Sequence, residues 1–338
     1  MHRFPQQRVH VGNFGLTALV VAVGGLVLIG LVGADAGLRV EAASKPEILR
    51  ATGALNAAKK VKGKVRQTST TVARATSTTL PPPKTFNVAT DRMTEVSGCA
   101  VAKGDANTVW LHNDSDNEPQ LFGLNLTTKA VRTVNVTNAL NNDWEDLAPL
   151  PSGGLLIGDI GSNDHSRSAV ELYEVNDLTQ SSATAVQRKY TYEDGPHNAE
   201  ALLVDPESAV DNPAVYVITK EETGQSGVYR TDRTALRKIG AVTITGEALI
   251  YPNQITGAAA LPGASGVLLR TYQYAYLFRR PKGQPFEASF GASPIRIALP
   301  FLIQSEAVCV EPDGRTAITT TESRGSPTIS FVLFAIPK

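Results

Sequence analysis

Residues 142–163 read NDWEDLAPLPSGGLLIGDIGSN, and this stretch contains the unit from which the fold is built. An acidic residue, Glu145, opens a short apolar run. The turn sequence PSGG follows, and a second apolar run, LLIGDI, ends in polar residues. Short apolar runs separated by Pro, Ser and Gly are typical of paired β-strands. The stretch therefore predicts two strands joined by a tight turn, with Trp144 as a wedge between neighbouring units.

The same unit recurs through the rest of the body. The first runs read VSGCAVA, DWEDLAPL, NAEALLVDP, ITGAAALP and QSEAVCVEPDG, each is followed by a second apolar run, and a third run containing Tyr or Phe comes after it. The anchor residues that open the first runs lie 47 to 57 positions apart; they are Gly98, Glu145, Glu200, Gly257 and Glu306. Repeats of about 40–50 residues with several strands each indicate β-propeller blades. We therefore predict an all-β fold, a single β-propeller over residues 85–338.

The spacing of the repeats predicts five blades. Only 32 residues follow Glu306, which is enough for three strands. We expect the missing outer strand to come from residues 85–91, TFNVATD, so that pairing the two ends closes the ring and removes exposed edges. Six blades remain an alternative, because the gaps of 55 and 57 residues leave room for extra strands. A β-sandwich is the alternative architecture for the whole pattern.

An uncharged segment lies near the N-terminus. Residues 14–34, FGLTALVVAVGGLVLIGLVGA, are long enough to span a hydrocarbon core of about 30 Å as a helix. Residues 1–13 carry Arg3 and Arg8, so the positive-inside rule makes them a cytoplasmic basic tail. We favour a retained transmembrane signal-anchor over cleavage at the small residues of positions 34–36.

Residues 35–84 change in character. They are first Ala- and Lys-rich and then Thr-, Ser- and Pro-rich, with too few apolar residues for a core. Such a composition predicts a disordered stalk. The expected location is therefore the cell membrane, single-pass, with the propeller outside the cytoplasm, or secretion if the leader is cleaved.

Charge divides the chain in the same place. Residues 1–84 contain 12 Lys/Arg and three acidic residues, whereas residues 85–338 contain 20 basic and 29 acidic residues, so their net charges are +9 and −9. An acidic body excludes nucleic acid as a partner, because phosphate binding needs basic patches. It favours metal ions or cationic ligands.

Two cysteines, Cys99 and Cys309, are too few for a zinc site of cysteines. Closure of the ring would place them on neighbouring first strands. A disulfide and two small buried thiols both remain open.

The repeat predicts a polar site at the mouth of the central channel. First strands line the channel of a propeller, so the anchors Glu145, Glu200 and Glu306 should form a ring. Like charges at that distance are costly unless a cation offsets them. The second strands end near Asp114, Asp159, Lys220, Arg270 and Glu322. The predicted ligand-binding residues are Glu145, Glu200, Glu306, Asp114, Lys220, Arg270 and Glu322. The predicted metal ligands are Glu145, Glu200, Glu306 and Asp159, with Ca²⁺ as the ion, since Ca²⁺ takes six to eight oxygens.

Simpler roles compete with these. The glutamates could bind backbone N–H groups and hold strands in place, Asp159 lies between glycines typical of a tight turn, and a lone His197 is often a surface residue. The catalytic candidates, if the protein is an enzyme, are Glu200, Asp159 and His197. The sequence contains no nucleophile elbow, P-loop, zinc-protease or dinucleotide motif, which disfavours those enzyme classes.

Several motifs also resemble a known family. In chain order they are VWLHNDSDN, NDWEDLA, GDIGSN, YEDGPHNAEALLVDP, VYVITKE, ITGAAALPGASGVLLRTYQYAYLF and SEAVCVEPDGRTAITTTES. Over roughly residues 94–336 they resemble an uncharacterised exported propeller family of high-GC Gram-positive bacteria. The resemblance implies a propeller outside the cytoplasm and implies no activity. More distantly, the layout is similar to calcium-using propellers of the gluconolactonase group and the phytase-like esterases.

Two functions are therefore expected. The first is a membrane-anchored binding module that holds a small polar ligand, a metal ion or an envelope protein at its acidic channel. The alternative is a calcium-dependent lactonase or phosphoester hydrolase, in which Ca²⁺ polarises the substrate and a channel carboxylate acts as base. A purely structural envelope protein is the third hypothesis. Whether the protein is an enzyme stays open at this point.

Overall fold

The computed structural model describes residues 17–23, 26–32, 41–42, 80–247, 251–302, 304–323 and 325–338. The predicted cytoplasmic tail, 1–13, and residues 43–79 of the predicted stalk lie outside the described residues. The chain divides into two compact units, Met1–Thr76 and Ser77–Lys338. Each unit is described by itself.

The described part of the first unit is a small antiparallel sheet. Strand β1 (Thr17–Val23) pairs with β2 (Leu26–Val32), and β2 pairs with β3 (Glu41–Ala42). The structure therefore has strands in place of the helix predicted over 14–34. The sequence agrees with strands, because both runs contain several Val residues, and Gly-Gly between two such runs is typical of a hairpin turn. Among the described residues, no helix is long and apolar enough to cross a membrane.

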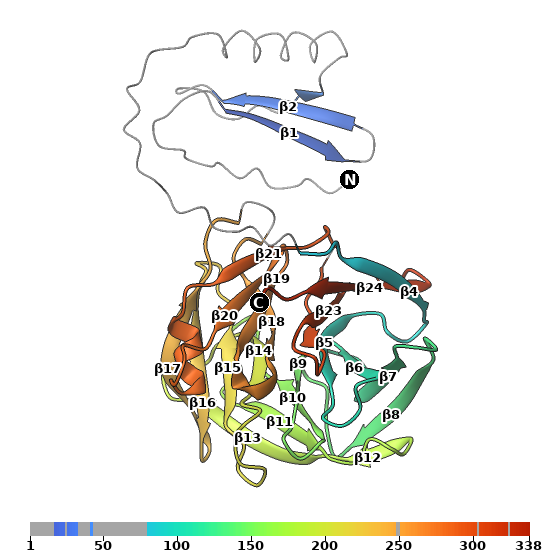
Figure 1. Cartoon of the computed structure of the whole chain (residues 1–338), viewed down its shortest axis with the longest axis vertical. Helices are drawn as coiled ribbons and strands as arrows, with labels where there is room; N and C mark the ends of the chain where they lie inside the picture. Colours follow the sequence, from blue (N-terminus) through green and yellow to red (C-terminus); the bar gives the residue numbers. More distant parts are fainter. Residues whose placement is uncertain are drawn as a thin grey trace. The chain divides into compact units, whose positions relative to one another are not determined.

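The second unit is an all-β, propeller-like arrangement of antiparallel sheets (Figure 1). One five-stranded sheet contains β5 (Val96–Val101), β6 (Thr108–Asn113), β7 (Gln120–Asn125), β8 (Val131–Thr137) and β12 (Ser182–Thr184). An eight-stranded sheet begins with the set β9 (Trp144–Pro149), β10 (Leu155–Asp159), β11 (Val170–Val175) and β13 (Val186–Tyr192). Its second set is β14 (Ala199–Val204), β15 (Val215–Thr219), β16 (Gln225–Asp232) and β17 (Ala235–Thr243). A short parallel pairing of β13 with β17 joins the two sets.

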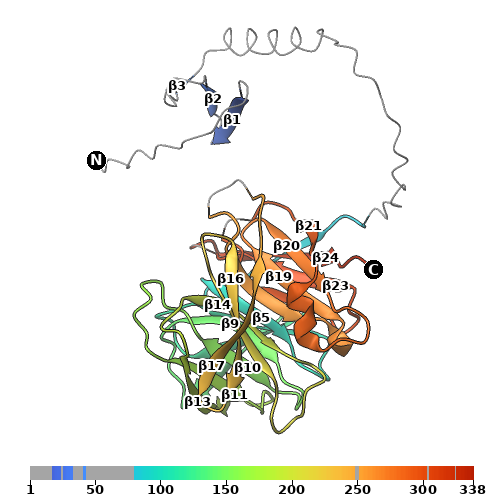
Figure 2. The same ribbon diagram turned by 90° about the vertical axis from the view of Figure 1, so that its left-hand side faces the viewer.

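Two four-stranded sheets complete the body. The first contains β18 (Ile255–Ala260), β19 (Gly266–Thr271), β20 (Tyr274–Arg279) and β21 (Ile295–Ala298), with the 3-10 helices η1 (Pro262–Ala264) and η2 (Phe286–Gly291) beside it. The second contains β22 (Val308–Val310), β23 (Thr316–Thr320), β24 (Thr328–Ala335) and β4 (Lys84–Ala89). The first strands contact one another in a closed order, β5 with β9, β9 with β14, β14 with β18, β18 with β22, and β22 with β5. The sheets therefore surround a common axis, with β5, β9, β14 and β18 near the middle of the body in Figure 1. Figure 2 shows the same sheets turned by 90°.

The two ends of the body pair with each other. Strand β4 lies antiparallel to β24, from Lys84 opposite Leu333 to Ala89 opposite Thr328. Phe86 stacks on Phe331 with ring centroids 5.2 Å apart, which adds apolar contact to the backbone ladder. This pairing confirms the closing strand predicted from residues 85–91.

The hydrophobic core lies between adjacent sheets. Trp144 on β9 is fully buried and packs with Trp110 on β6 and Tyr173 on β11. Its ring centroid lies 6.1 Å from that of Tyr173. Trp144 is thus the wedge between neighbouring units that its position in the repeat predicts.

Both cysteines are buried, free thiols. Cys99 on β5 and Cys309 on β22 line a small apolar cavity of about 20 Å³ between the first strands. Burial raises the pKa of Cys99 well above its usual value, and the neighbouring Cys309 raises it further. Of the two alternatives left by the sequence, the structure has the free thiols.

Candidate functional site

The entrance residues of the first strands lie in β-bulges. The strand register skips one residue in four of these strands, at Ser97 in β5, Glu145 in β9, Glu200 in β14 and Thr256 in β18. A bulged residue is left out of the ladder, and its side chain is directed away from the regular alternation. The equivalent residues are therefore Ser97 and Thr256, one position before the glycine anchors predicted from the repeat.

The bulged residues link one first strand to the next. The Ser97 hydroxyl donates to the Glu145 carbonyl oxygen at 2.7 Å, and it lies 3.2 Å from the Glu145 carboxylate. The Thr256 hydroxyl donates to the Glu306 carbonyl oxygen at 3.4 Å. These bonds hold the backbone from which Glu145 and Glu306 project.

Directly after the bulge in β9, the side chain of Asp146 reaches from β9 to the neighbouring first strands β14 and β18. Its carboxylate accepts hydrogen bonds from the backbone N–H groups of Leu147 at 2.8 Å, Leu202 at 2.9 Å and Ala258 at 3.0 Å. Three first strands, β9, β14 and β18, are thus held by one side chain that is 0 % exposed. Burial raises the pKa of Asp146, and the three N–H donors act in the opposite direction.

The equivalent position in β5 is Gly98, and the close approach of the strands explains the glycine. A Cβ there would lie 2.9 Å from the Asp146 backbone and 2.3 Å from the His112 ring. The channel therefore has room for one polar side chain at this level, and Asp146 occupies it.

Five carboxyl groups converge above Asp146, and we refer to them as the carboxylate cluster: Asp114, Asp143, Glu145, Glu200 and Glu306. One oxygen from each of the first three lies within 4.8 Å of the others. Burial raises the pKa of Glu145 well above its usual value, and the charges of Glu200 and Asp114 raise it further. The pKa of Glu306 is likewise raised well above its usual value, first by burial and then by the charge of Glu200. The three glutamates of the predicted ring thus influence one another across the channel.

The other carboxyl groups of the cluster respond in the same direction. Burial raises the pKa of Asp143 to about 6, with the Asp114 charge adding to the shift. Burial also raises the pKa of Glu200 to about 7, although Lys220 opposes the shift. Glu200 is therefore about half protonated at neutral pH, whereas Asp143 takes up its proton mainly below it, and a bound cation would compete with both protons.

A lysine and a tyrosine connect two of the glutamates. Lys220 forms an ion pair with the Glu200 carboxylate and donates to the Tyr272 hydroxyl at 3.0 Å. That hydroxyl donates to Glu306 at 2.9 Å. Burial acts to lower the pKa of Lys220, but the Glu200 carboxylate outweighs it, so the lysine keeps its charge. The second oxygen of Glu200 is buried and has no hydrogen-bond partner among the described residues.

Gly161 provides the space in which two of the carboxylates lie. A Cβ at this position would come within 2.3 Å of Glu145 Oε1 and 2.4 Å of Asp143 Oδ2. The backbone N–H of Gly161 donates to the Asp143 carbonyl oxygen at 3.2 Å. Any larger residue would push the carboxylates apart, so the glycine keeps Asp143 and Glu145 together.

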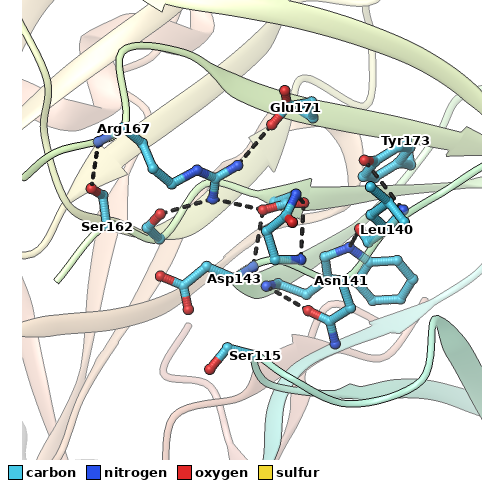
Figure 3. Close-up of polar contacts among 12 residues, drawn as sticks. Ser115, Leu140, Asn141, Asp143, Ser162, Arg167, Glu171 and Tyr173 are labelled. Carbon is cyan, nitrogen blue, oxygen red and sulfur yellow. Dashed lines mark hydrogen bonds and ion pairs between the residues drawn. The ribbon is translucent and has the colours of Figure 1, made fainter.

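Asp159 positions the segment that carries Asp143. Its carboxylate accepts from the backbone N–H groups of Asn142 at 3.3 Å and Asp143 at 3.1 Å. Arg167 pairs with Asp159 at 2.6 Å and with Glu171 at 2.7 Å, and Figure 3 shows it reaching from the loop of Ser162 to Glu171. Asp159 is fully buried. Its oxygens are thus engaged in holding the loop.

The other predicted residues lie in different places. Arg270 is fully buried between β19 and β23, where Nε donates to Thr319 at 3.2 Å, and burial lowers its pKa to about 9. Glu322 accepts from the Gln304 side chain at 3.2 Å, and its charge raises the pKa of Glu306. His197 bonds to Asp194 at 2.9 Å and to the Tyr229 hydroxyl at 2.8 Å, contacts that do not include the cluster.

Asp143 and Tyr272 are two site residues that the repeat does not identify. A usable signal existed for the first, because Asp143 and Glu145 are two residues apart and side chains at that spacing share a face of an extended chain. No comparable signal marked Tyr272, which is one of three tyrosines in TYQYAY.

A cavity of about 560 Å³ opens beside the carboxylate cluster, and we call it the mouth cavity. Lys220 and Tyr272 line it, and they bond to Glu200 and Glu306 of the cluster. Its other lining residues include Asn163, Tyr251, Gln254 and Gln304. The apolar cavity among the later residues of the first strands, about 20 Å³, is far smaller than the mouth cavity. A ligand of appreciable size therefore fits the polar mouth.

Comparison with known proteins supports the fold only. No family model matches the chain, and no curated protein matches it. The solved structures that are similar include the nidogen/laminin complex, with 14% identity, a TM-score of 0.40, and 68% of this chain and 73% of that chain covered. The major allergen Mala s 1 of Malassezia sympodialis has 9% identity and a TM-score of 0.50, and the match covers 75% of this chain and 96% of that chain. The latter match agrees with a propeller-like arrangement.

Proposed function

We propose that the protein is a cation-dependent binding module whose channel mouth holds a divalent cation, with Ca²⁺ as the preferred ion. The observation that carries the proposal is the buried Glu200 oxygen that has no hydrogen-bond partner among the described residues. It belongs to a cluster of five carboxyl groups, in which Lys220 forms an ion pair with Glu200. Buried like charges are costly without a compensating cation. An all-oxygen set of carboxylates suits a hard ion, and Ca²⁺ tolerates irregular sets of six to eight oxygens better than Mg²⁺ does.

Asp114, Asp143 and Glu145 would hold the ion, since their oxygens are the ones that approach within 4.8 Å of one another. Glu200 would contribute its free oxygen while Lys220 retains the other. The Asp159–Arg167 pair supports this arrangement because it holds the loop of Asp143 in place.

We further propose that the body has five blades. Five sets of four strands, each with one of the ring-forming first strands, support this count. The repeat spacing in the sequence agrees with it. The exported location and a partner in the cell envelope stay predictions.

Addition of Ca²⁺ to the full-length chain is expected to raise its melting temperature by about 5 °C or more relative to EDTA. An ion that binds only the folded state stabilises it by about 2.7 kcal/mol at a hundredfold excess over Kd, and one kcal/mol corresponds to about 2–4 °C in a domain of this size. The shift should shrink between pH 8 and pH 5, because protons compete for carboxyl groups with pKa values of about 6 and about 7.

The variants Glu145→Gln and Asp143→Asn should lose the Ca²⁺ shift and melt at a higher temperature than the parent in EDTA, since each removes like-charge repulsion. Glu118→Gln, which changes an exposed carboxylate outside the cluster, is the matched control and should keep the full shift. An equal Ca²⁺ shift in all three variants would contradict the proposed site.

Hydrolysis of a lactone or phosphoester is a second candidate. It is favoured by the mouth cavity, which adjoins the carboxylate cluster through Lys220 and Tyr272. In that case the ion would polarise the substrate oxygen, and Glu200, with a pKa of about 7, would serve as base. Calcium-dependent turnover that Glu200→Gln abolishes, measured with a lactone and aryl phosphate panel, would identify the enzyme. Ca²⁺ binding without turnover of any compound in the panel would favour the binding module over the hydrolase.

A further inference from the structure

We infer that the mouth cavity binds a saccharide, one that is uncharged or bears an amine, of about the size of a disaccharide. The inference rests on the proposed function, because the cavity adjoins the proposed cation site. Its volume of about 560 Å³ lies within the range of about 300–1,000 Å³ that is typical of small-molecule sites.

Several side-chain amides line the mouth cavity. Gln254 lines the cavity and is only 7 % exposed, yet its amide forms no hydrogen bond with any described residue. The Nδ2 group of Asn163 and the Oε1 atom of Gln304 likewise have no hydrogen-bond partner in the described part of the chain. An amide offers both donors and acceptors without charge, which matches hydroxyl groups that also donate and accept. All three residues line the cavity, so these amide groups are available to hydrogen-bond a polar ligand there.

Two tyrosines supply an apolar surface beside the amides. Tyr251 is 58 % exposed, and its ring centroid lies 5.7 Å from that of Tyr272 at an angle of 49°. Tyrosine combines a broad apolar face with a polar tip. The C–H face of a sugar ring can pack on such a surface while its hydroxyl groups reach the amides.

Charge decides which saccharides fit. Glu221 and Glu222 also line the cavity. Lys220, the one lysine among its described lining residues, is already paired with Glu200. The carboxylate cluster adds further negative charge below. An anionic sugar would be repelled, whereas a neutral sugar is unaffected and an amine is attracted.

Backbone strain is concentrated around the same cavity. His165, Tyr251 and Gln304 line it and have positive φ angles of 54°, 55° and 42°. Such conformations are costly for residues other than glycine and tend to persist where they serve a function. Here they orient side chains into the mouth, which agrees with a preformed ligand site.

The test is saturation-transfer NMR on the full-length chain in Ca²⁺ buffer. The probes are cellobiose, maltose, diacetylchitobiose and the glucosamine dimer of chitosan, with digalacturonic acid as the anionic comparison and spermidine as an amine without a sugar. At least one neutral or amine-bearing disaccharide should bind, and digalacturonic acid should not. Co-sedimentation with insoluble cellulose and chitin then separates capture of a free sugar from capture of a glycan chain end, and either result supports the inference.

Two variants probe the cavity itself. Tyr251→Ala should weaken disaccharide binding about tenfold or more, and Gln254→Met, which keeps the length of the side chain and removes its amide, should do the same. Ile239→Ala, on the outer strand β17 and 43 % exposed, is the control and should bind as the parent does. The inference is overturned if no disaccharide binds, if digalacturonic acid binds equally well, or if spermidine alone binds.

The cation proposal and the saccharide inference fail separately. Tyr251→Ala should keep the Ca²⁺ melting shift of the parent, because its side chain lies outside the carboxylate cluster. A retained Ca²⁺ shift without disaccharide binding would refute the saccharide alone. Disaccharide binding that is equal in Ca²⁺ and in EDTA, with no melting shift, would refute the cation site alone.

Discussion

Replacement of Asp146 by alanine is expected to destabilise the protein by about 3–5 kcal/mol, enough to unfold much of it at 37 °C. Three buried N–H groups, on Leu147, Leu202 and Ala258, would lose their common acceptor. Each unsatisfied buried donor costs about 1–3 kcal/mol, and water that enters the space recovers part of the loss. Urea denaturation followed by circular dichroism measures the change.

A graded series distinguishes this role from a loss of side-chain volume. Asp146→Asn has nearly the same size and keeps one acceptor oxygen, but it points an N–H₂ group at a backbone donor, so it should fall between the parent and Asp146→Ala. The exposed Asp211 provides the control, since Asp211→Ala should change the unfolding free energy by less than about 0.5 kcal/mol. If Asp146→Ala were as stable as this control, the carboxylate would not hold the three first strands together.

Replacement of Arg167 by methionine is expected to cost about 3–5 kcal/mol and to weaken the Ca²⁺ melting shift. The change leaves the fully buried Asp159 without its ion pair. It also removes the 2.7 Å ion pair between Arg167 and Glu171. Asp159 in turn holds the backbone of Asp143, so the loop that carries this carboxylate would lose its support. Arg167 acts on the proposed ion through Asp159 and is a positioning residue.

The control for this experiment is Arg188→Met. Arg188 is 58 % exposed and lies 3.8 Å from Glu174, a geometry in which an ion pair contributes about 0–1 kcal/mol. Arg167→Lys should recover part of the stability and of the Ca²⁺ shift, because it restores the charge but not the forked contacts. Parent-like stability and Ca²⁺ response in Arg167→Met would show that Asp159 does not depend on the pair.

The sequence predicted the architecture well because the fold repeats itself. Apolar runs of strand length, turns rich in Pro and Gly, and regular anchors all pointed to the propeller-like arrangement. The closing strand could be predicted as well, since too few residues follow Glu306 to complete its sheet. A membrane helix was predicted over 14–34 because these 21 uncharged residues are long enough to span a bilayer. The same segment also contains the Gly24–Gly25 pair, which favours a hairpin.

Prediction of the site was partial, and the bulges explain why. Glu145 and Glu200 are bulged residues, as is Ser97, whereas the repeat alone suggested Gly98. A bulge shifts the alternation of side chains by one position, and nothing in a pattern of apolar runs reports it. Asp143 and Tyr272 lie outside the strands, so the repeat does not place them. Asp159 holds the backbone of Asp143, and the hydroxyl of Tyr272 bonds to Lys220 and Glu306.

Charged residues were harder to place than apolar ones. Arg270 lies at the end of an apolar run and was predicted to bind a ligand at the channel mouth, but the structure buries it against Thr319. Asp159 was a predicted metal ligand, and its oxygens instead accept from Asn142, Asp143 and Arg167. In both cases the partner lies on a different element, so local sequence could not show that a partner exists.

The pairing of β4 with β24 also has a consequence for the order in which the protein is made. Ala89 cannot pair until Thr328, its partner in β24, has been synthesised 239 residues later. Until then the first outer strand has an open edge, and β5 cannot contact β22, the neighbour that completes the ring. Contacts between distant parts of a chain form slowly, and open edges favour pairing with other chains. We therefore expect nascent molecules to be exposed to aggregation until β24 has been synthesised and has paired with β4.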